Sequence, residues 1–120
     1  MATWADVSRV LRAVPLAVQT PGRREWKVKK KLAIWERPLR KADLDALGDA
    51  APTGPVLGVY VPLEVKEALL RGRRGPYFTT PHFDGYPYVL VVLRRITPGA
   101  LKKLLPQACA ARATKVARPG

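Results

Sequence analysis

The chain has one cysteine and one histidine in 120 residues. Cys109 has no second thiol to pair with, which excludes an internal disulfide and any zinc site built on several cysteines. His82 also lacks the further ligands that a metal site needs, so the sequence predicts no metal and no cofactor. Low cysteine content is typical of a reducing compartment, and we therefore expect a cytoplasmic protein.

Long apolar runs are also missing. The longest strongly apolar run, residues 88–93, has the length of a strand, whereas a membrane span needs about 18 apolar residues. The first residues carry Asp6, Arg9 and Arg12 and no apolar centre, unlike a secretory signal. We therefore expect no membrane segment and no secretory signal.

Acidic residues are scarce, with 9 Asp and Glu against 22 Lys and Arg, a net charge of +13. Apolar residues make up 48% of the chain, as in a folded globular domain. The length predicts one domain over residues 1–113, followed by a basic and frayed tail over residues 114–120. We expect a monomer, with a dimer as the open alternative.

Hydrophobic periodicity predicts an α+β domain. The predicted helices are residues 3–14, 40–47 and 63–70 and a last helix that begins at Thr97-Pro98. The predicted strands are residues 25–29, 32–37, 56–61, 77–79 and 88–96, and the predicted loops are residues 19–22, 49–55 and 81–87. The strand over 88–96 is the longest and most apolar, so we expect it to be central in the sheet. Pro106 cannot donate a hydrogen bond to the carbonyl of Lys102 and is expected to kink or divide the last helix.

The first two strands form a predicted hairpin with Lys29-Lys30-Lys31 at its tip. A tight type I′ turn favours Gly or Asn, and the tip has neither, so such a turn would be strained. The sequence predicts either a loop longer than two residues or a bulge in the strands. Trp26 and Trp35 are expected on the inner face of the hairpin, and stacking on nucleic-acid bases is the functional alternative for Trp35.

Positive charge is concentrated in the hairpin and in a glycine-flanked loop. A hairpin with lysines at its tip and at alternate positions can follow a phosphate backbone or enter a groove. Outward lysines also protect a sheet edge from aggregation, and charge alone does not separate DNA, RNA and acidic proteins as partners. The candidate phosphate-binding residues are Arg23, Arg24, Lys27, Lys29, Lys30, Lys31, Arg71, Arg73 and Arg74.

Residues 79–87 form the one loop where catalytic residue types gather. His82 and Asp84 could perform acid–base chemistry, but Asp84-Gly85 is a strong turn dipeptide and His82 follows a proline. We therefore interpret this segment as a rigid loop and predict no enzymatic activity. The alternative function is a pocket for a protein or a small molecule, formed by Trp35, Lys66, His82, Asp84 and Tyr86.

Four segments resemble the MmcQ/YjbR-like proteins, and the actinobacterial type in particular. They are residues 4–7, 31–38, 66–70 and 78–87, of which Thr-Thr-Pro-His-Phe-Asp-Gly-Tyr-Pro (79–87) is the most specific. The resemblance spans roughly residues 3–112. It implies a frataxin-like (CyaY-like) α+β fold, with an antiparallel sheet covered on one face by helices at the chain ends. It also implies DNA binding and supplies no catalytic residues.

Two features depart from that family, namely Lys29-Lys30 where glycine is usual at the hairpin tip, and Pro106 in the last helix. The frataxin likeness also suggests an iron chaperone, which would need an acidic ridge for a hard cation. The first helix offers only Asp6, beside Arg9 and Arg12, so we reject that function. The sequence as a whole predicts a largely non-specific nucleic-acid-binding protein, with double-stranded DNA as the expected partner.

Overall fold

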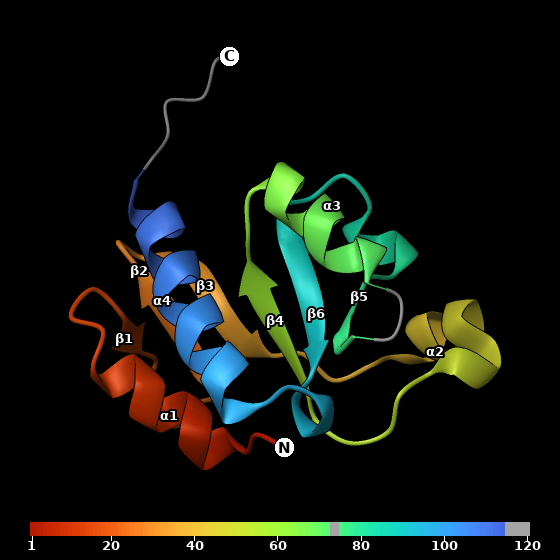
Figure 1. Cartoon of the computed structure of the whole chain (residues 1–120), viewed down its shortest axis with the longest axis horizontal. Helices are drawn as coiled ribbons and strands as arrows, with labels where there is room; N and C mark the ends of the chain where they lie inside the picture. The colour runs from red at the N-terminus through yellow and green to blue at the C-terminus, as the bar shows by residue number, and fades with distance from the viewer. Residues whose placement is uncertain (73–74, 115–120) are drawn as a thin grey trace.

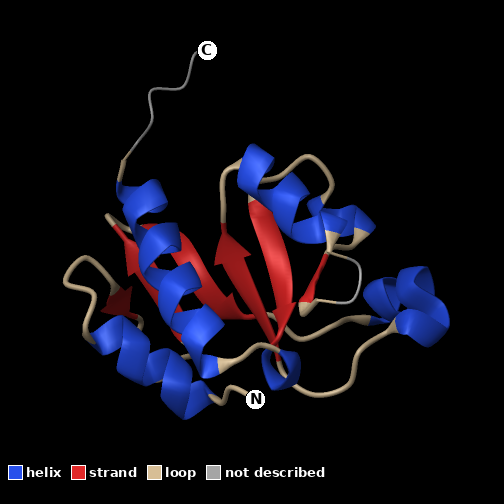
Figure 2. Ribbon diagram, in the orientation of Figure 1, coloured by secondary structure: helices blue, strands red, loops and turns tan. Residues whose placement is uncertain are grey.

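A computed structural model describes residues 1–72 and 75–114, and its fold is α+β as the sequence predicts (Figures 1 and 2). The helices are α1 (Trp4–Arg12), α2 (Lys41–Leu47), α3 (Leu63–Arg71) and α4 (Pro98–Ala113). The strands are β1 (Val18–Gln19), β2 (Glu25–Val28), β3 (Lys31–Glu36), β4 (Val56–Tyr60), β5 (Tyr77–Phe78) and β6 (Tyr88–Val92). They form one antiparallel sheet in the order β1-β2-β3-β4-β6-β5.

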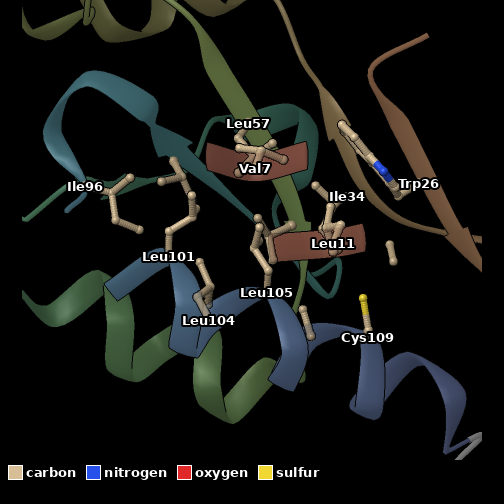
Figure 3. Close-up of a cluster of buried hydrophobic side chains, with 14 of the residues drawn as sticks. Val7, Leu11, Trp26, Ile34, Leu57, Ile96, Leu101, Leu104, Leu105 and Cys109 are labelled. Atoms are coloured by element: carbon tan, nitrogen blue, oxygen red, sulfur yellow. The ribbon is translucent and has the colours of Figure 1, made fainter. Parts of the chain in front are cut away.

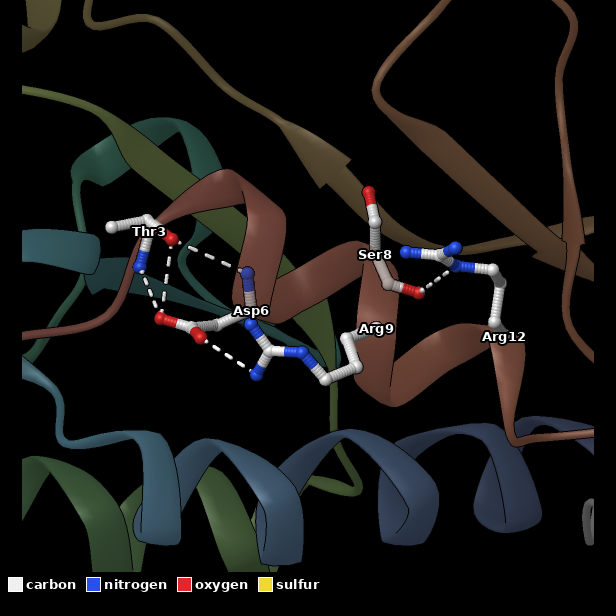
Figure 4. A network of polar contacts seen from close by, with 5 residues as sticks. All are labelled: Thr3, Asp6, Ser8, Arg9 and Arg12. Carbon is white, nitrogen blue, oxygen red and sulfur yellow. Dashed lines mark hydrogen bonds and ion pairs between the residues drawn. The ribbon is translucent and has the colours of Figure 1, made fainter.

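Helix α1 begins with a reciprocal cap (Figure 4). The backbone N–H of Asp6 donates to the Thr3 hydroxyl at 3.3 Å, and the backbone N–H of Thr3 donates to the Asp6 carboxylate at 2.9 Å. The Thr3 hydrogen bond and the nearby Arg9 guanidinium lower the pKa of Asp6. The cap satisfies backbone donors that the first helical turn leaves free, which explains why α1 begins here.

Helices α1 and α4 lie side by side across one face of the sheet (Figure 1). Between them and the strands lies the main core, in which each helix contributes residues at helical spacing (Figure 3). Its largest fully buried side chains include Leu11, Ile34, Leu57, Leu101 and Leu105. Cys109 is also buried there, and burial raises the pKa of its thiol to about 11, so the thiol is unreactive near neutral pH.

The opposite face of the sheet carries a smaller, aromatic cluster. Along β6, Val89 and Val91 belong to the main core, whereas Leu90 belongs to the second cluster, because successive side chains point to opposite faces. Trp26 lies in the main core and Trp35 in the second cluster. The expectation that both tryptophans share one inner face is therefore wrong.

The β2–β3 hairpin has a two-residue turn and also a bulge. Lys29 and Lys30 have φ values of 53° and 68°, which is the pattern of a type I′ turn. The tip is therefore a two-residue turn and not a longer loop. The register passes from Trp26↔Ile34 to Lys27↔Leu32, which leaves Ala33 as the extra residue. Of the two alternatives that the sequence left open, the bulge is observed and the longer loop is not.

Three other expectations need correction. Strand β6 ends at Val92 and residues Leu93–Arg95 form a 3-10 turn, so β6 is shorter than predicted and lies beside the edge strand β5. Helix α4 is a single 16-residue element that contains Pro106, because its buried face continues on both sides of the proline. The sequence predicts a loop that begins at residue 19, whereas residues Val18–Gln19 form the short edge strand β1.

Two of the predicted segments include residues that the structure does not describe. The predicted tail over residues 114–120 lies outside the described residues apart from Thr114, and so do residues 73–74 of the basic loop. Among the helices in residues 1–72 and 75–114, none is both long and apolar enough to cross a membrane.

The contact between Gly58 and Trp35 yields a test of the sheet's second face. A Cβ at Gly58 would lie 2.7 Å from Cη2 and Cζ2 of the Trp35 ring, so Gly58→Ala forces the indole off the sheet. We expect a loss of about 1–3 kcal/mol in the free energy of unfolding, measured by urea denaturation. The control is Gly99→Ala, where a Cβ meets nothing within 4 Å and stability should not fall. Equal stability of Gly58→Ala and the parent would contradict this packing.

Candidate functional site

The hairpin carries a row of exposed cations along its length. Lys30 and Lys31 are exposed at the tip, and Arg23 is exposed just before β2 at the other end. Between them, the side chain of Lys27 is 44% exposed and its Nζ lies 3.8 Å from a Glu25 carboxylate oxygen. An ion pair this exposed contributes little, so Lys27 is free to exchange partners.

Two other predicted phosphate ligands are exposed but also contact groups of the same chain. Nζ of Lys29 donates to the carbonyl of Ala113 at 3.0 Å, which places a cation at the negative C-terminal end of α4. The Arg24 guanidinium lies 3.2 Å from Glu36 and 5.0 Å from the centre of the Trp4 ring. The structure therefore assigns these two residues a structural contact each.

Helix α4 anchors the hairpin at a second point, through Arg112. Its Nε donates to the carbonyl of Leu32 at 3.0 Å, and its guanidinium donates to the Tyr88 hydroxyl at 3.2 Å. The same guanidinium lies 4.3 Å from the centre of the Tyr60 ring. These contacts join the last turn of α4 to β3, β4 and β6, so they hold the hairpin against the rest of the sheet.

The second basic cluster lies apart from the hairpin. Arg71 ends α3 beside β5, whereas β2 is near the opposite edge, with β3, β4 and β6 between them. Four strand spacings of about 4.8 Å separate β2 from β5 by roughly 19 Å. Arg73 and Arg74 lie outside the described residues. The structure thus does not place Arg71 beside the hairpin lysines.

An open cleft of about 450 Å³ lies at the base of the hairpin, where sequence reasoning predicted none. It is lined by Gly22, Arg23, Arg24, Glu25, Trp35, Glu36 and Pro38. The cleft exists because Glu25 is the register partner of Trp35, which brings the segment before β2 next to the end of β3. The cleft therefore brings together Arg23 and Arg24, two predicted phosphate-binding residues, and Trp35, which the sequence analysis assigned to the pocket with His82.

A tight turn shapes one wall of this cleft. The backbone N–H of Arg23 donates to the carbonyl of Thr20 at 3.1 Å, and Gly22 has a φ of 74°. Pro21 followed by a glycine of positive φ is the signature of a type II turn. The Pro-Gly pair that predicts a turn in the sequence thus also directs the two arginines toward the cleft.

Trp35 also lines the cleft and is firmly supported. Its ring lies against Gly58, and its centre is 5.2 Å from that of Tyr88, which meets it edge-on. Phe83 lies 6.2 Å away on the same face of the sheet. The indole is half-buried and so remains partly exposed to solvent. Its contacts with Gly58 and Tyr88 hold it in position without a ligand.

The polar lining of the cleft combines both signs of charge. Arg24 and Glu36 form one ion pair at 3.2 Å. Glu25 accepts a hydrogen bond from the Thr20 hydroxyl at 2.7 Å and faces Lys27. Arg23 makes no ion pair within residues 1–72 and 75–114, so it is the cation of the cleft with the freest guanidinium.

The structure brings part of the other predicted pocket together around a buried lysine. Nζ of Lys66 donates to the carbonyls of Phe83 at 2.6 Å and Tyr86 at 2.9 Å. Burial lowers the pKa of Lys66, and the charge of Asp84 partly offsets this effect. Lys66 thus fixes the loop from inside, and Trp35 lies near the loop through its contact with Phe83.

His82 and Asp84 are both exposed on this loop. The His82 ring meets the Phe83 ring edge-on at 4.8 Å, and the described structure contains no hydrogen bond between His82 and Asp84. The described residues also contain no group of three His, Cys, Asp or Glu side chains that could hold a metal ion.

Sequence reasoning missed a buried ion pair beside the second cluster. The Arg37 guanidinium lies 3.1 Å from the Asp43 carboxylate, and their side chains are only 7% and 5% exposed. Arg37 also donates to the carbonyl of Pro38 and lies over the Phe83 ring at 5.2 Å. The pair therefore fixes the segment that leaves β3, including Pro38 of the cleft wall.

Comparison with known proteins yields relatives but no described function. The uncharacterized protein Rv2570 of Mycobacterium tuberculosis is 49% identical over 120 aligned positions, which cover 96% of this chain and 92% of the relative. The uncharacterized protein Mb2600 of Mycobacterium bovis matches with the same identity and coverage. The chain belongs to the family of these mycobacterial proteins. No protein-family profile and no solved structure matches it.

The buried pair predicts how acid affects stability. Burial alone would raise the pKa of Asp43, but the Arg40 backbone N–H and the Arg37 charge outweigh it and hold the pKa below its ordinary value of 3.8. The resulting stabilisation is present above about pH 4 and is lost as the pH falls through the lowered pKa. Asp43→Asn should cost about 3 kcal/mol of unfolding free energy at pH 7, because Arg37 is left unpaired.

Urea denaturation at pH 7 and near pH 2 measures this effect. The difference between Asp43→Asn and the parent should shrink in acid, and Asp45→Asn, on an exposed pair, should change stability by less than about 0.5 kcal/mol. A deficit for Asp43→Asn that stays constant over this pH range would show that the charge of Asp43 does not stabilise the fold.

Proposed function

We propose that this chain is an MmcQ/YjbR-like cytoplasmic protein that binds nucleic acid, chiefly double-stranded DNA and largely without sequence preference. The observation that carries the proposal is the row of exposed cations along the hairpin, Arg23, Lys27, Lys30 and Lys31, on a chain with a net charge of +13. Phosphate neutralisation supplies most of the affinity in non-specific binding, so such a row needs no base contacts to act.

The length of the row suits a phosphate backbone. Strand β2 (Glu25–Val28) separates Arg23 from Lys30 by about 13 Å, given roughly 3.3 Å per strand residue. One DNA strand presents a phosphate about every 3.4 Å along the helix axis, so the row spans about four of them. Four cations over this length can each reach a separate phosphate.

The strained tip is a second argument in support. Lysine in the left-handed region is unfavourable, and both central turn positions here are lysine. Glycine or asparagine would stabilise the same turn. Lys29 also donates to the carbonyl of Ala113, whereas Lys30 is exposed, and keeping a strained lysine at that second position is the expected outcome when a surface serves binding rather than folding.

The family part of the proposal rests on the motifs at residues 4–7, 31–38, 66–70 and 78–87. An antiparallel sheet with the N- and C-terminal helices on one face, as observed here, is the architecture that the resemblance implies. It leaves the other face of the hairpin free of helices. The DNA-binding role attached to that resemblance is consistent with the charge of the hairpin.

Salt dependence tests the proposal through two variants of equal charge. Changing Lys27, Lys30 and Lys31 to Ala removes three hairpin cations, and changing Arg12, Lys102 and Lys103 to Ala removes three exposed cations from the helical face. For a labelled 20-base-pair duplex followed by fluorescence anisotropy, the slope of log affinity against log salt should be about −4 in the parent. The magnitude of this slope should fall by about 2.7 in the hairpin variant and change little in the helical variant.

Two outcomes would contradict the proposal. One is the absence of binding at low salt. The other is an equal loss in both variants, which would show that the effect follows total charge and not the hairpin surface.

The turn offers a test that separates binding from folding. Lys30→Gly relieves a left-handed lysine and should raise the free energy of unfolding by about 0.5–1 kcal/mol, while it weakens duplex binding. Lys31→Gly removes the same charge from the first residue of β3, where no positive φ is relieved, and should not stabilise. Urea denaturation and anisotropy measure the two effects. Unchanged affinity in Lys30→Gly would remove this residue from the interface.

A further inference from the structure

The lining of the cleft at the base of the hairpin indicates a ligand different from the phosphates proposed above. A site for phosphate would present cations alone, whereas here Glu25, the register partner of Trp35, adds a carboxylate to a lining that includes Arg23. Carboxylates accept hydrogen bonds from N–H groups, and the edges of nucleobases carry such groups on amino substituents and ring nitrogens. Trp35 also lines the cleft, and its indole offers a flat surface to the same ligand.

We propose that this cleft binds one unpaired nucleobase of a nucleic acid whose phosphates lie along the hairpin. The inference rests on the proposed function and adds the class of nucleic acid. In an intact duplex the base faces are stacked and their pairing edges are occupied, so only a single strand, a bulge or a flipped base can enter. The protein would therefore bind a DNA duplex that contains an unpaired base more tightly than a regular duplex.

Trp35 is positioned to accept a base with little reorganisation. The close contact with Gly58 and the T-shaped contact with Tyr88 hold the indole in place without a ligand. A side chain that is already ordered loses little conformational entropy on binding, which favours affinity. Stacking of a base on an aromatic side chain is a sequence-tolerant interaction and agrees with binding that has little sequence preference.

The remaining features of the cleft connect base and backbone. Arg23 is at once a lining residue and the first cation of the hairpin row, so a strand could place a base on Trp35 and its phosphate on Arg23. The Glu25 carboxylate accepts one hydrogen bond, from the Thr20 hydroxyl at 2.7 Å, and keeps lone-pair capacity for a base edge. The volume of about 450 Å³ lies within the range of small-ligand sites.

Anisotropy with matched duplexes tests the preference for an unpaired base. A labelled 20-base-pair duplex is compared with the same duplex containing one bulged nucleotide. The parent should bind the bulged duplex about tenfold more tightly, and Trp35→Leu should bind both equally while keeping the affinity of the parent for the regular duplex. Tyr86→Leu removes an exposed aromatic residue outside the cleft and should keep the tenfold preference.

Photocrosslinking locates the base independently of any variant. A bulged 5-iodo-deoxyuridine is irradiated in the complex with the parent protein, and the tryptic peptides are analysed by mass spectrometry. The crosslink should fall on the peptide that begins at Leu32 and contains Trp35. A crosslink to any other segment would overturn the assignment of the cleft.

The outcomes separate this inference from the proposed function. Salt-dependent binding of both duplexes with equal affinity would overturn the base site and leave the phosphate surface intact. An equal loss of affinity for both duplexes in Trp35→Leu would show a structural role for Trp35 and would also overturn the base site. Failure of the parent to bind either duplex at low salt would overturn both proposals.

Discussion

Burial of one sheet face beneath α1 and α4 is the constraint on which the rest of the structure depends. Side chains such as Leu11, Leu101 and Leu105 have no alternative apolar surface, so the two helices must lie against Ile34, Leu57 and their neighbours. Alternation along each strand then sends the intervening residues to the other face. That face receives no terminal helix, which is why it can carry the aromatic cluster and the cleft.

The fold could largely be predicted from the sequence because its strongest signals are local. Thr3 and Asp6 cap α1 as their spacing predicts, and Thr97 followed by proline begins α4. The predicted division of the last helix at Pro106 is wrong, since a helix with buried residues on both sides of a proline tolerates one missing hydrogen bond. The strand expected over residues 88–96 ended early, because apolar runs do not show where pairing stops.

The candidate site was harder to predict because it depends on register. Counting from a turn at Lys29-Lys30 without a bulge would pair Glu25 with Ile34 and direct Trp35 elsewhere. The extra residue Ala33 shifts the pairing so that Glu25 meets Trp35, and the cleft follows from that shift. Charge counts alone also could not show that the exposed Lys29 and Arg24 contact groups of the same chain, whereas Arg23 forms no ion pair within residues 1–72 and 75–114. The structure thus narrows a basic segment to exposed cations on one hairpin, of which Arg23 lines the same cleft as Trp35.

The central claim is that the hairpin face, and not the helical face, contacts nucleic acid. Backbone amide chemical shifts, recorded for the whole chain with and without an unlabelled 20-base-pair duplex, test it most directly. The account predicts perturbations concentrated in residues 22–38, with α1 and the exposed positions of α4 near their free values. Perturbations concentrated on α1 and α4, or spread evenly over all exposed cations, would contradict it.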